Sequence, residues 1–291
     1  METAAVSASE EIVWLGMRLV VPAGWEILRH SVRSQKGRLV LMDRRRQRLQ
    51  LSWVRMPTAP ALDRAMADYR SRDLEEKADR TFSPLPSVGR WRGFRRHDER
   101  AVLTRAGQYD ARLERWVEMA VEWPEGLDAE LEERILRGFG VEGEADGRRW
   151  RAFGLNVRTP PRWVLETADA KPADVTFTFR EGRRAASIRR IGATEVWYEG
   201  NLEGFLRKEA AGMKVKVSAP KHNRHPACLG ESRQTRSRLG EWLGLGRLQL
   251  DLVWLCPVAH AMFHVTTRAR GAAVLPEQFV VRCCGRGGGE R

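Results

Sequence analysis

Cysteine and histidine, the side chains best suited to holding a soft metal ion, gather in one stretch of this sequence. All four cysteines and four of the six histidines lie between positions 222 and 284. They are Cys228, Cys256, Cys283, Cys284, His222, His225, His260 and His264. Thiolates and imidazoles are the usual ligands of Zn²⁺. A zinc site is therefore one hypothesis for this stretch, with His225, Cys256, Cys283 and Cys284 as the preferred ligands.

The spacing of these residues leaves other interpretations open. The sequence has no Cys-x-x-Cys pair, and Cys283 and Cys284 are neighbours, whose side chains seldom bind one ion together. The run His222-x-x-His225-x-x-Cys228 is only weak evidence for a set of metal ligands. Cysteine is also a common small hydrophobic residue of protein cores. A reactive thiol pair at Cys283 and Cys284 is a further alternative.

Motifs for catalysis are missing from the sequence. It contains no Gly-x-Ser-x-Gly, no His-Glu-x-x-His and no phosphate-binding glycine loop followed by Lys and Ser or Thr. The glycine-rich segment 240–246 lacks that lysine. We therefore expect a protein that is not an enzyme.

Positive charge is concentrated in the second half of the chain. Residues 1–145 hold 25 Lys and Arg against 24 Asp and Glu, whereas residues 146–291 hold 26 against 14. Such a surface attracts an acidic protein or another polyanion. The candidate binding residues are Arg183, Arg184, Arg189, Arg190, Lys214, Lys216, Lys221 and Arg224. Nucleic acid is the alternative partner, although no recognition motif supports it.

The elements that must position the candidate ligands read as antiparallel strands. Strands are expected near 225–237 and 247–256, so that Cys256 ends one strand where His225 begins its neighbour. A helix over 199–211 and a last helix over 274–282 are also expected. The last helix would end at Cys283 and Cys284. If the strands pair as a sheet, these ends can converge.

The same order of predicted elements occurs twice along the chain. Trp14 and Trp150 stand 136 residues apart in similar segments, and Trp25 and Trp163 stand 138 apart. A recurrence of this length indicates two copies of one domain. The expected boundaries are 11–141 and 149–284, with flexible tails at 1–10 and 285–291. Helices are predicted at 61–78 and 129–138 in the first copy, the latter with Asp128 as its cap.

The order of elements resembles the PsbP-like fold, and the segments Pro22-Ala23-Gly24-Trp25 and Pro160-Pro161-Arg162-Trp163 carry the resemblance. That fold is shared by an extrinsic photosystem subunit, a Ran-binding import factor and many bacterial proteins. The order of strands and helices itself predicts an α+β class, in which helices flank each antiparallel sheet. The resemblance implies a non-enzymatic binding or assembly role.

Neither a secretory signal nor an apolar run of membrane-spanning length is apparent. The sequence therefore predicts a cytoplasmic protein whose cysteines are reduced thiols or metal ligands.

Overall fold

The chain divides into two compact units, residues 1–142 and 143–291. The computed structural model describes residues 8–76, 80–99, 101–143, 147–209, 215–234, 247–270 and 273–284. Strand β1 begins at Ser9, inside the segment that was expected to be a tail.

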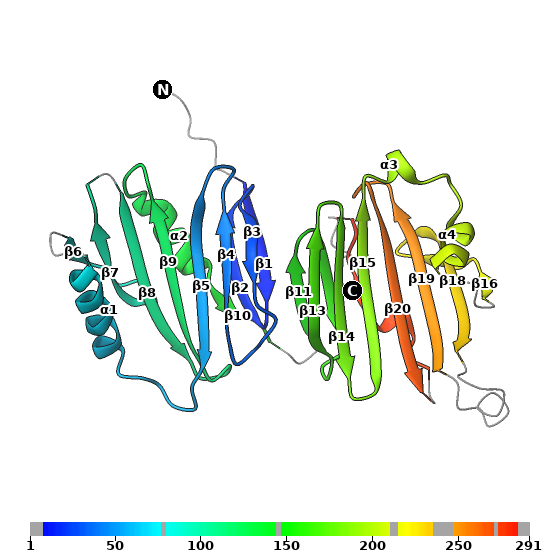
Figure 1. Cartoon of the computed structure of the whole chain (residues 1–291), viewed down its shortest axis with the longest axis horizontal. Coiled ribbons are helices and arrows are strands. Elements are labelled where there is room, and N and C mark those ends of the chain that lie inside the picture. Colours follow the sequence, from blue (N-terminus) through cyan, green and yellow to red (C-terminus); the bar gives the residue numbers. More distant parts are fainter. Residues whose placement is uncertain are drawn as a thin grey trace. The chain divides into compact units, whose positions relative to one another are not determined.

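The first unit is built from ten strands and two helices within its described residues (Figure 1). The strands are β1 (Ser9–Trp14), β2 (Met17–Pro22), β3 (Glu26–His30), β4 (Lys36–Met42), β5 (Gln47–Arg55), β6 (Thr81–Pro84), β7 (Arg92–His97), β8 (Val102–Asp110), β9 (Arg115–Trp123) and β10 (Gly140–Val141). The helices are α1 (Leu62–Glu76) and α2 (Ala129–Gly138).

The second unit repeats this order with shorter helices. Its strands are β11 (Arg148–Ala152), β12 (Leu155–Thr159), β13 (Val164–Lys171), β14 (Asp174–Glu181), β15 (Arg184–Gly192), β16 (Lys216–Ser218), β17 (Lys221–His222), β18 (His225–Gln234), β19 (Arg247–Cys256), β20 (Ala261–Arg270) and β21 (Val280–Val281). Its helices are α3 (Thr194–Trp197), α4 (Leu202–Glu209) and the 3₁₀ turn η1 (Pro276–Gln278).

The main sheets of the two units have the same antiparallel topology. The strand order is β3-β4-β5-β9-β8-β7-β6 in the first unit and β13-β14-β15-β20-β19-β18-β16 in the second. In each unit the opening hairpin pairs with the last short strand, β2 with β10 and β12 with β21. The repeat seen in the tryptophan segments thus extends to the whole order of strands.

The register of the opening hairpins corrects one detail of that repeat. Leu15 and Gly16 turn the first hairpin with φ of 52° and 81°, and Phe153 and Gly154 turn the second with φ of 54° and 74°. Two successive positive φ values are the mark of a type I′ turn. The offset is therefore 138 residues, as it is for Trp25 and Trp163. Trp150 consequently corresponds to Ile12, so the equivalence of Trp14 and Trp150 is wrong.

The fold is mainly β, and the expected α+β class is wrong. Strands hold 54% of the described residues and helices 16%. The reason is visible in the core of the second unit, where a strand hairpin covers the sheet instead of a helix. Trp150 of β11 packs against Phe179 of β14 with ring centroids 5.5 Å apart. Aromatic side chains on two β layers can fill this core without a flanking helix.

The predicted helix over 274–282 is also absent. This segment forms η1 and then β21, whose Val280 and Val281 pair with Arg158 and Val157 of β12. The turn ends after Gln278 because the β-branched Val280 and Val281 favour the extended conformation and pair with β12. Phe279 lies between η1 and β21 and reaches the core, where its ring centroid is 4.9 Å from that of Trp163.

The two helices of the first unit, α1 and α2, lie on opposite faces of its sheet. Glu132 of α2 accepts hydrogen bonds from Arg95 and Thr104, which pair directly across β7 and β8. Tyr69 of α1 instead contacts Arg105, whose side chain points the other way because strand residues alternate. No helix in the described part of the chain combines the length and hydrophobicity that crossing a membrane requires.

Candidate metal centre

Three elements of the second unit bring the four preferred ligands together. His225 is the first residue of β18, Cys256 is the last residue of β19, and Cys283 and Cys284 follow β21. Because β18 and β19 are antiparallel, with Ala227 opposite Trp254, the start of one strand meets the end of the other. The sequence-based convergence of His225 and Cys256 therefore follows from strand pairing.

The thiol of Cys284 lies in the middle of the cluster. Its Sγ is 3.1 Å from His225 Nε2, 3.3 Å from Cys256 Sγ and 3.6 Å from Cys283 Sγ. All four ligand atoms lie within 4.8 Å of one another. A tetrahedral zinc ion with Zn–S bonds of about 2.3 Å separates its sulfur ligands by about 3.7 Å. The cluster thus has the dimensions of a zinc coordination sphere.

Two thiols of the cluster, Cys283 and Cys284, have raised pKa values, which favour their protonated form. Hydrogen bonding with Cys256, followed by burial, raises the pKa of Cys284 to about 12. Burial raises the pKa of Cys283 as well. Metal ions bind the thiolate, so loading this site must release protons.

Two unsatisfied donors or acceptors lie beside the cluster. Trp254 Nε1 and His222 Nε2 are buried without a hydrogen-bond partner in the described residues, and their rings lie 4.4 Å apart. The Cys283 sulfur is the neighbour of the Trp254 indole N–H. A metal-bound thiolate accepts a hydrogen bond from such a donor, and contacts of this kind orient metal ligands. The indole N–H therefore fits a metal-loaded site better than the thiol form.

The fourth cysteine belongs to a different environment. Cys228 packs with Leu206, Val253 and Met262 in an apolar cluster between α4 and the sheet. Burial raises the pKa of its thiol. It behaves as a core hydrophobe, so the run from His222 to Cys228 does not form a ligand set.

The first unit has no such cluster at the corresponding place. Its β8–β9 hairpin closes at Asp110 and Arg115, as the β19–β20 hairpin closes at Cys256 and Ala261. Asp110 therefore occupies the position of Cys256. Its Oδ1 accepts from the backbone N–H groups of Arg112 and Leu113, at 3.0 and 3.1 Å. The carboxylate caps a turn where the second unit carries a thiol.

The candidate basic residues do not form a single surface. Arg184 pairs with Glu181 at 3.4 Å, and Arg189 pairs with Asp174 at 2.7 Å, which neutralises both cations. Arg189 and Arg190 follow one another on β15, so their side chains leave opposite faces of the sheet. Lys214 lies outside the described residues.

Four of the candidate cations are exposed and form no ion pair with any described residue. They are Arg183, Lys216, Lys221 and Arg224. Lys221 and Arg224 belong to the hairpin that joins β17 to β18, which begins with the metal-cluster residue His225. Two cations without an ion-pair partner among the described residues thus lie on the same hairpin as the candidate ligand His225.

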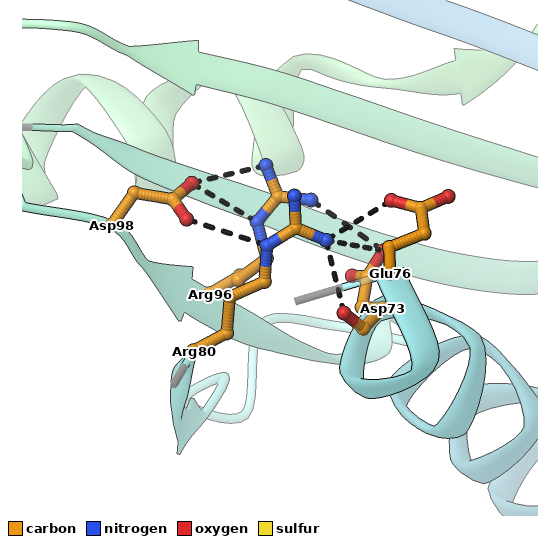
Figure 2. Close-up of polar contacts among 5 residues, drawn as sticks. All are labelled: Asp73, Glu76, Arg80, Arg96 and Asp98. Carbon is orange, nitrogen blue, oxygen red and sulfur yellow. Dashed lines mark hydrogen bonds and ion pairs between the residues drawn. The ribbon is translucent and has the colours of Figure 1, made fainter. Parts of the chain in front are cut away.

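A further charged cluster, in the first unit, has a structural role (Figure 2). It consists of Asp73, Glu76, Arg80, Arg96 and Asp98. Arg80 Nη1 lies 3.0 Å from Glu76, and Arg96 Nη2 lies 3.1 Å from Asp98. Both arginines also face Asp73 near the end of α1. The network therefore fastens this helix to the ends of β6 and β7.

Comparison of the sequence with protein-family models and with curated proteins finds no match. The resemblance to PsbP-like proteins stays a prediction.

Proposed function

We propose that the second unit holds one structural Zn²⁺ ion, bound by His225, Cys256, Cys283 and Cys284. The observation that carries this proposal is the convergence of four ligand atoms within 4.8 Å from three separate elements. Three sulfurs and one imidazole nitrogen form a ligand set that binds Zn²⁺ in preference to harder ions such as Mg²⁺ or Ca²⁺.

The ligand count supports a structural rather than a catalytic ion. Four protein ligands complete a tetrahedron, whereas catalytic zinc sites keep one position for water or substrate. This agrees with the absence of catalytic motifs in the sequence. The ion would act on the fold instead of on a substrate.

The segment that zinc would fasten is otherwise held by a short strand, a buried ring and single hydrogen bonds: Phe279 packs on Trp163, and the Arg282 N–H donates to the carbonyl of Asn156 at 2.9 Å. Strand β21 pairs with β12 over only two residues. The Asn223 side chain donates to the carbonyl of Val281 at 2.8 Å and links the β17–β18 hairpin to the same segment. Zinc would join this hairpin, the end of β19 and the C-terminal segment at one point.

The function that we propose for the protein is docking, with the zinc-braced hairpin as part of the docking surface. Asn223 and Arg224 adopt positive φ values of 50° and 64°, which a tight turn requires and which cost conformational energy. The turn displays Lys221 and Arg224 without ion-pair partners among the described residues. Cations held on a rigid turn suit an acidic protein surface.

Metal content of the untagged protein tests the zinc proposal. Elemental analysis should find one zinc per chain, and Cys256→Ser or Cys284→Ser should lose it. Cys228→Ser is the matched control, because Cys228 lies in the apolar cluster instead of the metal cluster. A protein that binds no zinc while its thiols are reduced would refute the proposal, as would equal loss of zinc in Cys228→Ser.

A further inference from the structure

A cavity of about 360 Å³ in the first unit is lined in part by Asp110, the residue that corresponds to Cys256. A larger cavity, of about 530 Å³, opens on the sheet face beside α1. The larger cavity is formed by β4, β5, β9, the loop before β4 and one side of α1. Its lining includes Lys36, Arg38, Ser52, Tyr69, Trp116 and Glu118. Cavities of several hundred Å³ with aromatic walls and a few polar groups are typical ligand sites.

The polar floor of the cavity follows from strand register. Arg38 lies opposite Ser52 across β4 and β5, and Ser52 lies opposite Glu118 across β5 and β9. Direct cross-strand neighbours share one face of a sheet. This row of side chains therefore runs across the open part of the face, and Tyr69 of α1 closes one side.

Gly107 and Glu118 fix the Trp116 ring on this face. A Cβ atom on Gly107 would lie 2.2 Å from that ring. The Trp116 indole N–H donates to Glu118 Oε1 at 2.8 Å. Trp53 follows Ser52 on β5, so its side chain leaves the opposite face of the sheet and packs over Gly37. The Trp116 ring is thus held in place before any ligand arrives.

Charge separates the interior of the cavity from its mouth. Burial and the neighbouring Glu118 raise the pKa of Tyr69 to about 12, so its hydroxyl stays neutral. Lys36 and Arg38 are exposed and form no ion pair with the described residues. Arg105 and Arg72 lie over the Tyr69 ring, 4.7 and 5.6 Å from its centroid. The cavity therefore offers hydrogen-bonding groups and the Trp116 ring inside, and at its edge two cations that form no ion pair with the described residues.

The same position is hollow in the second unit. The pair Arg189 and His264, opposite each other on β15 and β20, corresponds to Ser52 and Glu118 when the hairpins are matched from their closing pairs. Arg189 and His264 line a smaller cavity of about 240 Å³. A hollow at this place is thus a property of the repeated fold, and the two linings have diverged.

We propose that the cavity of the first unit binds a small anion with a planar ring, the ring lying against Trp116 beside the Tyr69 hydroxyl and the anionic group at Lys36 and Arg38. The anionic group is a phosphate ester or a carboxylate, which share this chemistry. Glu118 accepts a hydrogen bond from a ring N–H or amino group. The site is independent of the zinc centre.

Isothermal titration calorimetry on the full zinc-loaded chain tests this proposal. The probes are adenosine 5′-monophosphate for phosphate esters and indole-3-acetate for carboxylates. At least one should bind with a Kd below about 1 mM. Adenosine lacks the anion and inorganic phosphate lacks the ring, so each should bind at least about tenfold more weakly than the tighter probe. The tighter of the two probes identifies the anionic group.

A charge variant with a matched control locates the binding. Lys36→Gln/Arg38→Gln should weaken the tighter probe about tenfold. Arg44→Gln/Arg45→Gln removes the same charge from the exposed β4–β5 turn, outside the cavity, and should leave the affinity unchanged. Absence of saturable binding for both probes would overturn the proposal. Equal weakening by the two double variants would overturn it as well.

Discussion

The Sγ atoms of Cys256 and Cys284 lie 3.3 Å apart, although 28 residues separate them in the chain. Cys256 ends a strand in the middle of the sheet, and Cys284 follows a short strand of another layer. Two reduced thiols at this distance, with a third thiol and an imidazole beside them, gain little from one another but much from a shared metal ion.

Zinc removal should loosen the C-terminal segment more than the rest of the second unit. A chelator takes away the junction at Cys283 and Cys284, which leaves the two paired residues of β21, the Arg282 N–H bond to Asn156 and the buried Phe279 ring to hold the segment. Backbone amides of 279–284 should exchange with solvent at least about tenfold faster in the metal-free protein. Hydrogen exchange measured by mass spectrometry checks this. Unchanged exchange in that segment would show that zinc does not fasten it.

Trp254→Phe should weaken zinc binding about tenfold while the fold is kept. The phenyl ring retains much of the apolar contact but cannot donate to the Cys283 sulfur, and loss of such a donor typically lowers metal affinity by about 10- to 100-fold. Competition with a chromophoric chelator measures the affinity. Trp163→Phe is the control, because Trp163 packs on Phe279 away from the ligands. Equal affinities in the two variants would contradict the role assigned to the indole.

Lys221→Gln/Arg224→Gln should reduce binding to polyglutamate by about three- to tenfold at low salt. The control Arg180→Gln/Arg207→Gln removes the same charge, but these arginines are already paired with Glu166 and Glu203. Retention on an immobilised polyglutamate column compares them. If both variants lose retention equally, net charge and not the hairpin determines binding. Tighter binding to single-stranded DNA than to polyglutamate would favour nucleic acid as the partner.

Tyr69 should titrate well above the ordinary pKa of tyrosine. Burial and Glu118 raise its pKa from 10.0 to about 12. The unfolded chain therefore loses this proton first as the pH rises. The stability that the neutral hydroxyl contributes is complete below pH 10 and declines between pH 10 and about 12. Ultraviolet difference titration should show a late phenolate that Tyr69→Phe removes; a titration that is the same in both proteins would contradict this.

Local signals in the sequence were sufficient for several elements. The predicted cap at Asp128 is confirmed, since its side chain accepts from the N–H of Leu131 at 2.9 Å and the helix covers Ala129–Gly138. The helix expected over 61–78 is observed as Leu62–Glu76. Both elements have an apolar stripe of helical period and a clear boundary residue, which depend on near neighbours only.

The structure of the C-terminal segment and the fold class could not be predicted from such local signals. Val274, Phe279 and Val281 are buried because β21 joins a second layer of strands, and not because they share one face of a helix. That layer also replaces the flanking helices that an α+β fold would use. Long-range pairing of this kind leaves little trace in local periodicity.

The metal cluster was partly predictable for the same physical reasons. Enrichment of Cys and His in one copy singled out His225 and Cys256, and strand pairing explains why they meet. Neighbouring Cys283 and Cys284 seemed poorly suited to one ion, yet both sulfurs lie in the cluster. The cavity beside α1 gave no sequence signal, because Tyr69 and Glu118 come together only through packing of the helix on the sheet.

X-ray absorption at the zinc edge tests the central claim most directly, because it reports the ligand atoms themselves. The zinc-loaded protein should show three sulfur atoms at about 2.3 Å and one nitrogen at about 2.0–2.1 Å. Cys284→Ser should remove one sulfur from this shell, whereas Cys228→Ser should leave it unchanged. A shell made only of nitrogen and oxygen, or one unaffected by Cys284→Ser, would contradict the site described here.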